Sequence, residues 1–386
     1  MTNQRLQSLD AYRGATMLFM ASELLQIPKT MRQFPDSALA RFIEFKTNHV
    51  AWTGWSVWDL IQPSFMFMVG VALPWSIGNR MERGENPRQM WLHALWRAFL
   101  LVALGIFLRS THRQQTYFTF EDVLTQIGLG FPILFALGFT RPRTQAIAAG
   151  AVLLGIWGAF AMYPAPGADF NFPAVGVAAE WRHHLTGFAS HWDKNSNLAQ
   201  AADVWFLNLF PREKPFLFNG GGYLTLNFVP SLATMIFGLL AGGWLRKRGE
   251  LRPMIIAGIC GIVGGLALDA LGVCPMVKRI WTPSWTLFAG GCTTLILAAV
   301  YWAVDLKQSR GWTFPFLVVG MNSIAMYAMV HLMDGFLADS LKIHLGRGVF
   351  EMLGKQWAMV LQGSAVLAIL WWICLWMYRR KLFLRI

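Results

Sequence analysis

The stretch Asn48–Gly70, NHVAWTGWSVWDLIQPSFMFMVG, places a histidine, three tryptophans and an aspartate directly before a long apolar segment. Residues 60–78 carry no charged side chain, and about 20 such residues are enough to cross a bilayer as a helix. His49 lies outside this segment and Asp59 lies at its mouth. The pattern predicts a membrane-spanning helix with a titratable pair at one end, which is either an interfacial anchor or a reaction site.

The composition of the chain supports a membrane protein. Of its 386 residues, 55% are hydrophobic and 14% are charged, whereas soluble domains contain about 25% charged residues. The 19 tryptophans fit this class, because tryptophan collects at membrane interfaces. A net charge of +13 would be compatible with binding to nucleic acid, but the basic residues lie in short loops between apolar segments. We therefore expect a lipid bilayer as partner and no nucleic acid.

Ten apolar segments predict the fold class, an all-α polytopic helical membrane protein with about ten transmembrane helices. The loops on the side of the N-terminus are short and densely basic, for example RMERGENPR and RKRGELR. By the positive-inside rule both termini are cytoplasmic and His49 faces the opposite side. No cleavable signal peptide is expected. The predicted spans are 12–28, 59–78, 91–109, 121–139, 145–163, 223–245, 253–273, 285–304, 314–336 and 356–378.

One long connection, residues 164–222, is too polar to span a membrane and too aromatic to be a disordered linker. We expect it to form an extracytoplasmic cap on a single integral membrane domain covering residues 1–386. Gly238–Gly242 and Gly261–Gly265 have the small-xxx-small spacing that lets helices approach closely. Packing inside the molecule is favoured for these glycines, and a homodimer face is the alternative. The four cysteines show no metal-ligand spacing, so we expect no metal.

Six blocks, in order, resemble the transmembrane N-acetyltransferases typified by heparan-α-glucosaminide N-acetyltransferase, and more closely their bacterial relatives. The resemblance covers about Arg5 to Tyr327. The block PMVKRIWTPSW, with its K-x-x-W-T-P-S pattern, is the most specific. The blocks are RLQSLDAYRG at 5–14, NHVAWTGWSVWDLIQPSFMFMVGVALPWS at 48–76, EDVLTQIGLGF at 121–131, GYLTLNFVPSLATMIFGLLAG at 222–242, PMVKRIWTPSW at 275–285 and VGMNSIAMY at 319–327.

This resemblance implies an acyltransferase of the bacterial inner membrane. It implies that acetyl-CoA is bound from the cytoplasmic side and that its acetyl group passes to an amino sugar, such as glucosamine, on the periplasmic side. The active histidine of the family falls on His49. The chain departs from the family pattern where Thr125-Gln126 replaces a Gln-Arg pair and where Ala21-Ser-Glu replaces the region of an asparagine. These departures concern the acceptor more than the reaction type.

Three residues are the candidate catalytic groups. His49 suits the proton step, because an imidazole holds or releases a proton near neutral pH; it acts either as a general base or as a nucleophile that carries acetyl. Glu23 lies near the outer end of the first span, and an acid at that depth is a functional candidate. Its alternative is a carboxylate in loop water. Asp59 either takes part in catalysis or stabilises the start of its helix.

Further residues are assigned to the two substrates, each with a structural alternative. An aromatic belt, snorkelling cations, helix packing and the positive-inside rule would account for the same residues without a ligand. Arg97 is the most distinctive, because it lies inside an apolar segment. The candidates for the acceptor are Trp52, Lys278, Asp269 and Asn322, and those for coenzyme A are Arg97, Arg13, Arg246 and Ser323. The rival class is a sugar or amino-sugar transporter that uses the buried acids as a proton relay.

Overall fold

The computed structural model describes residues 6–247 and 249–384, and these residues form helices joined by loops. One isolated β-bridge, between Thr53 and Val277, is the extended pairing found within these ranges. The prediction of an all-helical membrane protein is confirmed. The chain divides into two compact units, which are described separately: unit 1 is Met1–Val50, Ser56–Ser64 and Leu297–Ile386, and unit 2 is Ala51–Trp55 and Phe65–Ile296.

Helices occupy all ten predicted positions, but fewer than ten qualify as spans. Seven described helices are long and apolar enough to cross a membrane, and a bent pair makes eight. The pair is α12 (Phe314–Gly320) and α13 (Ser323–Leu345), which meet at 66°. The seven are α4 (Ile61–Glu82, preceded by η2 at Trp58–Leu60), α5 (Pro87–Ser110), α7 (Pro142–Met162), α9 (Phe228–Lys247), α10 (Arg252–Ala270), α11 (Pro283–Tyr301) and α15 (Ala358–Arg379).

Two of the ten predicted spans coincide with helices that are too short to qualify by length. α1 (Gln7–Ala21) and α6 (Val123–Leu137) each have 15 residues. At about 1.5 Å per residue such a helix is about 22 Å long, short of the roughly 30 Å hydrocarbon core. The predicted first span, 12–28, also began too late and ran too far. The chain turns into the 3-10 helix η1 (Ser22–Leu25) directly after Ala21.

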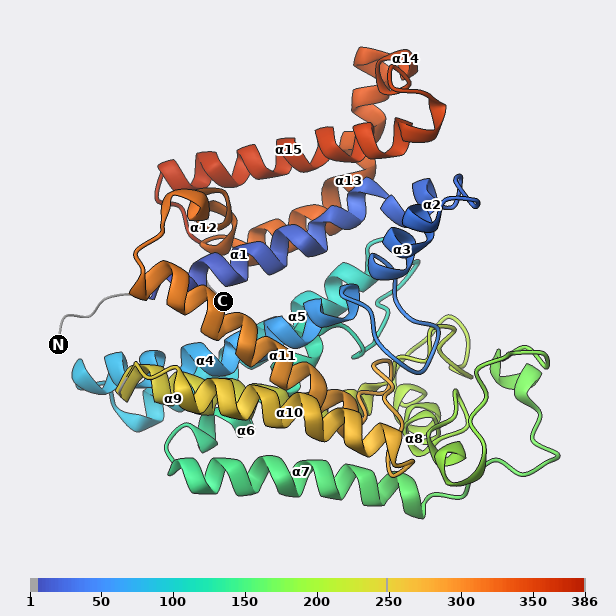
Figure 1. Cartoon of the computed structure of the whole chain (residues 1–386), viewed down its shortest axis with the longest axis vertical. Coiled ribbons are helices and arrows are strands. Elements are labelled where there is room, and N and C mark those ends of the chain that lie inside the picture. The colour runs from blue at the N-terminus through green and yellow to red at the C-terminus, as the bar shows by residue number, and fades with distance from the viewer. Residues whose placement is uncertain (1–5, 248, 385–386) are drawn as a thin grey trace. The chain divides into compact units, whose positions relative to one another are not determined.

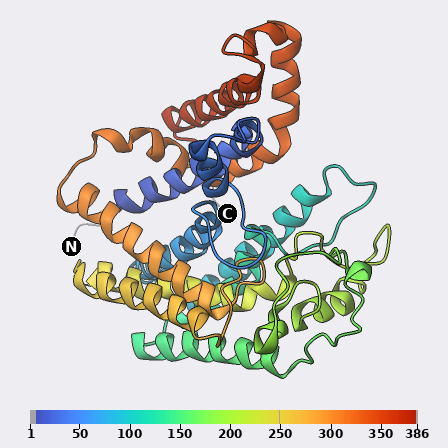
Figure 2. The same cartoon turned by 45° about the vertical axis from the view of Figure 1, so that its right-hand side comes forward.

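Unit 1 is built around α1, which packs against α12 (Figure 1), and the two backbones come close together at two glycines. A Cβ atom on Gly14 would lie 1.8 Å from the carbonyl oxygen of Phe316, and one on Gly320 would lie 2.0 Å from that of Asp10. Only glycine permits this approach. Figure 2 shows the blue α1 among the orange and red helices of the C-terminal part, and α13 and α15 also contact each other.

The end of α1 is followed by a sharp turn into the loop region of unit 1. Gln26 adopts left-handed backbone angles, with φ at 50°, between η1 and the short helix α2 (Ile27–Met31). This conformation is costly for a residue with a Cβ atom. The amphipathic helix α3 (Ala38–Lys46) packs on α2 and leads directly into Thr47, Asn48 and His49. Two short helices therefore carry the chain from α1 to the histidine.

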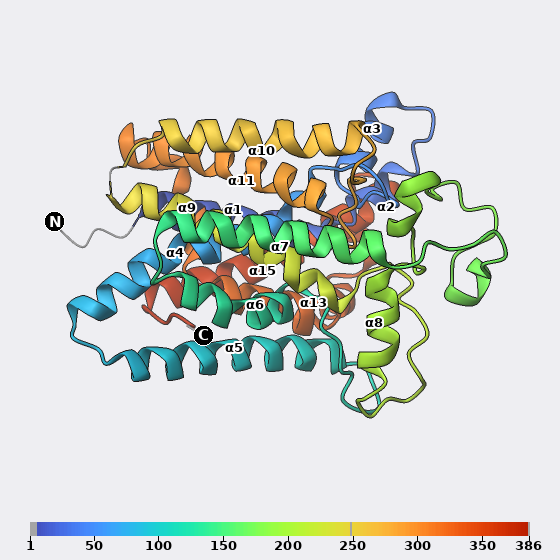
Figure 3. The ribbon, with the colours of Figure 1, turned by 90° about the horizontal axis from the view of Figure 1, so that it is seen from below.

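Unit 2 is a helix bundle held together by glycine contacts (Figure 3). α5 packs on α6, and α9 packs on both α6 and α7. Gly238 and Gly242 lie against the α4 backbone, where a Cβ atom would come within 1.9 Å and 2.4 Å of carbonyl oxygens. Gly261 and Gly265 of α10 meet α11 in the same way. The expectation that these glycines pack inside the molecule is confirmed.

The connection 164–222 is ordered and belongs to unit 2. It contains η3 (Phe172–Val175), η4 (Gly187–Trp192) and α8 (Leu198–Leu207). Trp192 and Ala199 from this segment share a buried cluster with Phe160 of α7 and Val277. This shared apolar core explains why a segment with many polar residues is folded. Its role as a cap stays a prediction.

A buried acidic group lies where the α5–α6 connection meets this segment. Asn219 Nδ2 donates a hydrogen bond to Glu121, which lies just before α6. Burial raises the pKa of Glu121 to about 7, although Arg109 opposes the shift. Burial likewise raises the pKa of Asp203 in α8 to about 6. Together they form a pH-sensitive region outside the span-length helices.

Candidate active site

The loop before α4 closes on itself through two polar side chains. Asn48 Oδ1 accepts from the His49 amide at 2.9 Å, and the Asn48 carbonyl accepts from Ser56 Oγ at 2.5 Å. His49 Nδ1 lies 2.6 Å from Asp59 Oδ1. Asp59 Oδ2 accepts from both the backbone N–H and the hydroxyl of Ser56, each at 3.0 Å. The predicted pair His49 and Asp59 is therefore in direct contact.

These contacts fix the chemical state of the imidazole. The Asp59 side chain has no exposed surface, and its two oxygens accept three hydrogen bonds. An ionised Asp59 can only accept hydrogen bonds, so in that state His49 Nδ1 carries the proton that it shares with Asp59. The other ring nitrogen, Nε2, then bears the lone pair. The His49 side chain is 36% exposed, so a buried carboxylate orients a reactive group at an accessible surface.

His49 lines a cavity of about 270 Å³ that lies within unit 1. Its wall comes from four neighbouring segments: η1, the region of α2, the loop after α3 and η2. The predicted residue Glu23 lines the same cavity, so the structure brings Glu23 and His49 to one site. Asp59 lies behind His49 and is not part of the wall. The lining residues are Ser22, Glu23, Gln26, Ile27, Pro28, Lys29, Arg32, Thr47, Asn48, His49 and Trp58.

The charges of the cavity have both signs. Glu23 is exposed on η1, and Lys29 and Arg32 supply positive charge from the region of α2. Arg32 is held by an ion pair with Glu44, with 2.7 Å between Nε and Oε1. Trp58 forms the apolar wall, and its ring meets that of Phe19 edge-on, with 5.0 Å between centroids. An ammonium group, hydroxyls and a sugar-like apolar face would each find a partner here.

A buried polar row follows α1 away from this cavity. Tyr12 donates to Ser64 Oγ at 2.9 Å, and both side chains are buried. Ser8, Asp10 and Thr16 are also buried on α1. Polar groups at membrane depth are costly and mark functional paths more often than packing alone. The row leads toward the break between α12 and α13.

Three predicted residues lie at that end of unit 1. Asn322 occupies the break itself, fully buried, and its Oδ1 accepts from the Leu384 amide at 3.2 Å. Its Nδ2 has no hydrogen-bond partner among residues 6–247 and 249–384. Ser323 begins α13 and is half-buried. Arg13 pairs with Asp10 at 3.4 Å. The side-chain amide of Asn322 is thus a buried donor in need of an acceptor.

The other predicted residues belong to unit 2. Trp52 is completely buried, and its Nε1 donates to the Trp192 carbonyl at 3.1 Å. Lys278 is also buried, with its ammonium 4.6 Å from the Tyr223 ring centroid and 3.3 Å from the Tyr223 hydroxyl. Both side chains hold loops together in this unit. For Trp52 and Lys278 these contacts favour the packing alternative over contact with a saccharide.

The remaining unit 2 residues also have structural contacts. Asp269 Oδ1 accepts from the Met276 amide at 2.8 Å, which secures the turn after α10. The Arg97 guanidinium lies 4.8 Å from the Phe131 ring centroid. Arg246 donates to the Pro74 carbonyl at 2.5 Å and pairs with Glu82 at 3.3 Å. These contacts tie the helices of unit 2 to one another.

Sequence reasoning missed Ser56, which holds Asp59, and the cations Lys29 and Arg32. A signal for Ser56 was present, since a serine three residues before an acid and an apolar run is the signature of a capping box. Half of that motif is formed here, because the acid accepts from the Ser56 amide. No signal pointed to Lys29, which lies in the short helix α2, or to Arg32, which ends it. Within the described parts of the chain, no cluster of three metal-ligating side chains occurs.

The fold and this site define a polytopic helical membrane protein with an oriented histidine–aspartate pair at a cavity of mixed charge. No family model matches the chain. Among curated proteins, human heparan-alpha-glucosaminide N-acetyltransferase is 23% identical over 427 aligned residues, and the mouse protein of the same name is 22% identical over 426. Each alignment covers 99% of this chain and 60% of the relative. The chain is thus distantly similar, over its length, to a membrane N-acetyltransferase.

Proposed function

We propose that this protein is a membrane N-acetyltransferase that moves an acetyl group from acetyl-CoA to the amine of glucosamine or a related amino sugar. The observation that carries the proposal is the contact between His49 and buried Asp59 at the wall of a cavity that Glu23 also lines. The distant similarity to heparan-alpha-glucosaminide N-acetyltransferases supports the reaction class. The acceptor follows from the resemblance and from the mixed charge of the cavity.

In this proposal His49 Nε2 is the reacting atom. As a general base it takes a proton from the acceptor amine while the new C–N bond forms and the thioester C–S bond breaks. As a nucleophile it first takes the acetyl group from sulfur and then passes it to the amine. An acceptor that arrives as ammonium first loses one proton to solvent, and the neutral amine then attacks. In the general-base route the proton that Nε2 takes from the attacking amine passes to the departing thiolate. In the nucleophile route the thiolate leaves first and takes its proton from solvent, and the amine later releases its proton to solvent as the C–N bond forms and the bond between the acetyl carbon and Nε2 breaks. Asp59 is a positioning residue, because it contacts His49 but does not itself line the cavity.

Glu23 acts on the acceptor. Its carboxylate attracts the ammonium form of the amino sugar into the cavity before the proton is removed. Lys29 and Arg32 contact hydroxyls or acidic groups of the same saccharide, and Trp58 supplies an apolar face. Three residues predicted to bind the acceptor make structural contacts in loops of unit 2, and their binding role stays a prediction: Trp52, Lys278 and Asp269.

Acetyl-CoA fits the other end of unit 1. The Nδ2 group of Asn322, which has no hydrogen-bond partner among the described residues, can donate to an amide carbonyl of the pantetheine arm. Ser323 is the next residue in the chain, and Arg13 lies in α1, which contacts α12 and α13. The assignment of Arg97 and Arg246 to the CoA phosphates stays a prediction from the sequence, and both residues belong to unit 2. We propose, from the basic loops and the family resemblance, that CoA is bound on the cytoplasmic side of a bacterial inner membrane, where both termini lie, and the amino sugar on the periplasmic side.

Purified protein in detergent tests the proposal. Radiolabelled acetyl-CoA is incubated with and without glucosamine, and CoA release and acetylated sugar are both measured. We expect product from the wild type and from His344→Ala, an exposed histidine of unit 1 that serves as matched control. We expect none from His49→Ala. An absence of both product and CoA binding in the wild type would contradict the proposal and favour a sugar transporter.

A further inference from the structure

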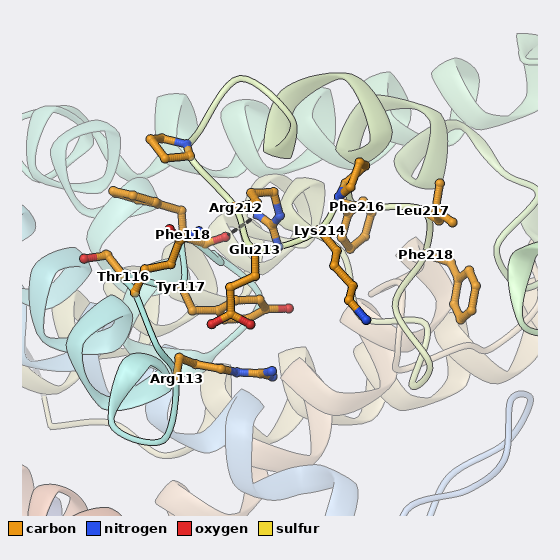
Figure 4. Close-up of a pocket in the computed structure, with 13 residues that line it drawn as sticks. Arg113, Thr116, Tyr117, Phe118, Arg212, Glu213, Lys214, Phe216, Leu217 and Phe218 are labelled. Atoms are coloured by element: carbon orange, nitrogen blue, oxygen red, sulfur yellow. Dashed lines mark hydrogen bonds between the residues drawn. The ribbon is translucent and has the colours of Figure 1, made fainter.

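A second cavity, of about 310 Å³, lies within unit 2 and contains none of the residues assigned above. It is formed by two segments that are far apart in sequence: the connection after α5, around Arg113–Phe118, and the connection after α8, around Pro211–Phe218. Figure 4 shows Arg113, Tyr117 and Lys214 directed into the same space. This volume is at the lower end of the range for ligand sites.

Aromatic rings hold two guanidinium groups in place at this cavity. The Arg113 guanidinium lies 4.5 Å from the Tyr117 ring centroid, and that of Arg212 lies 5.0 Å from the same ring and 5.5 Å from Phe216. Arg212 also donates to the Phe118 carbonyl at 2.8 Å. Stacking uses the flat face of a guanidinium and leaves its in-plane N–H groups as donors. Arg113 is therefore presented in a defined orientation at low cost in entropy.

The cavity carries excess positive charge. Three cations line it, Arg113, Arg212 and Lys214, against one acid, Glu213. Glu213 accepts instead from the Gln114 amide at 3.0 Å. Throughout 6–247 and 249–384, neither Arg113 nor Lys214 has a carboxylate within ion-pair distance. Two cations directed into one cavity without an acidic partner are a site for an anion.

The side chains around the cavity narrow the class of anion. A fixed guanidinium edge beside a flexible ammonium matches the several oxygens of a phosphate group. Leu217, which lines the cavity, is 63% exposed, and the nearby α8 side chain Trp205 is 68% exposed. Apolar side chains next to cations are typical of groups at the membrane interface. The volume admits a phosphate and a small substituent.

We propose that this cavity binds a phosphate ester through Arg113 and Lys214, with Tyr117 holding Arg113. The phosphate belongs either to the headgroup of an anionic phospholipid or to a soluble phosphorylated sugar. The site is separate from His49 and its cavity, so it extends the protein's interactions beyond the acetyl-transfer chemistry proposed above. It would anchor the loops of unit 2 to the membrane surface or hold a second saccharide group.

Binding by the full-length protein tests the site. Phosphatidylglycerol is titrated in detergent and its retention is followed by native mass spectrometry, with phosphatidylcholine as the neutral reference; glucosamine 6-phosphate is titrated by calorimetry. The variant Arg113→Gln/Lys214→Gln is compared with Arg182→Gln/Lys355→Gln, which removes the same charge from exposed positions elsewhere. We expect the first variant to bind at least about tenfold more weakly, since two charge-assisted contacts are lost, and the control to bind as the wild type.

The two ligands identify the source of the phosphate. Loss of phosphatidylglycerol retention alone assigns the site to a lipid, and loss of glucosamine 6-phosphate binding alone assigns it to a soluble sugar. Tyr117→Leu keeps both cations but removes the stacking, and should weaken the same ligand by a smaller factor. Equal binding by wild type and Arg113→Gln/Lys214→Gln, or an equal loss in the control variant, would overturn the proposal.

Discussion

Replacing Asp59 by asparagine exchanges one carboxylate oxygen for an NH2 group and should move the proton of the His49 ring from Nδ1 to Nε2. The amide and the hydroxyl of Ser56 both donate to Asp59 Oδ2, whereas His49 Nδ1 lies against Oδ1. The amide oxygen of an asparagine would therefore stay with Ser56, and its NH2 group would face the imidazole. His49 Nδ1 must then accept a hydrogen bond, which moves the ring proton to Nε2. The nitrogen directed to substrate loses its lone pair.

The size of the effect follows from this geometry. A charge-assisted hydrogen bond contributes about 1.5–3 kcal/mol, and about 1.4 kcal/mol corresponds to a factor of ten in rate. Loss of the contact alone thus lowers transfer roughly 10- to 100-fold. The wrong tautomer lowers it further, toward the roughly 10⁴-fold that such a change causes in hydrolytic triads.

The assay is the rate of acetyl transfer from labelled acetyl-CoA to glucosamine, with CoA binding and thermal unfolding as controls for folding. Because His49 and Asp59 act as a unit, the double variant His49→Ala/Asp59→Asn should be no slower than His49→Ala. A folded Asp59→Asn protein with a transfer rate within about threefold of wild type would refute the tautomer argument.

Three further changes test other parts of the structure. His49→Ala should insert and unfold like the wild type yet lose transfer, and wild-type turnover would reject its assignment. Because burial raises the pKa of Glu121 from 4.5 to about 7, the folded state should lose stability as pH rises from about 5 to 7, by up to about 3 kcal/mol. Glu121→Gln should therefore raise the unfolding temperature at pH 8 but not at pH 5, and an equal shift at both would contradict this. Gly14→Ala should destabilise by at least about 2 kcal/mol through its clash with α12, whereas Gly335→Ala, with open space around it, should be neutral or stabilising in thermal unfolding.

The positions of the helices could be predicted from sequence because apolar runs of span length are distinctive. Their ends could not. The start of α1 at Gln7 was missed, since its buried Ser8, Asp10 and Tyr12 resemble a polar entry segment until α12 is known to cover them. Likewise, the break at Asn322 depends on a 66° bend within one apolar run. Hydropathy therefore finds helices whose side chains face lipid, but it does not find the polar turns of a helix that are buried against other helices.

The histidine and aspartate of the candidate site were predictable because they lie ten residues apart in one loop. Other assignments required tertiary information. Trp52 resembled a saccharide platform in sequence, but its indole packs under a segment that begins more than a hundred residues later, with 140 residues separating it from its hydrogen-bond partner Trp192. The cations of the second cavity were not singled out, because Arg113 and Lys214 belong to unremarkable loops until folding brings those loops together.

The packing of α1 also has a consequence for how the protein is made. This helix is short, carries several buried polar side chains and packs on α12. Its partners come much later in the chain. The Ser8 amide, for example, donates a hydrogen bond to Asp305, which is 297 residues away in sequence. A helix of this kind is a poor substrate for insertion by itself. α1 therefore cannot reach its final place until α12 and the Asp305 region have been synthesised. Unit 1 is thus completed only when α12 and α13 have packed against α1.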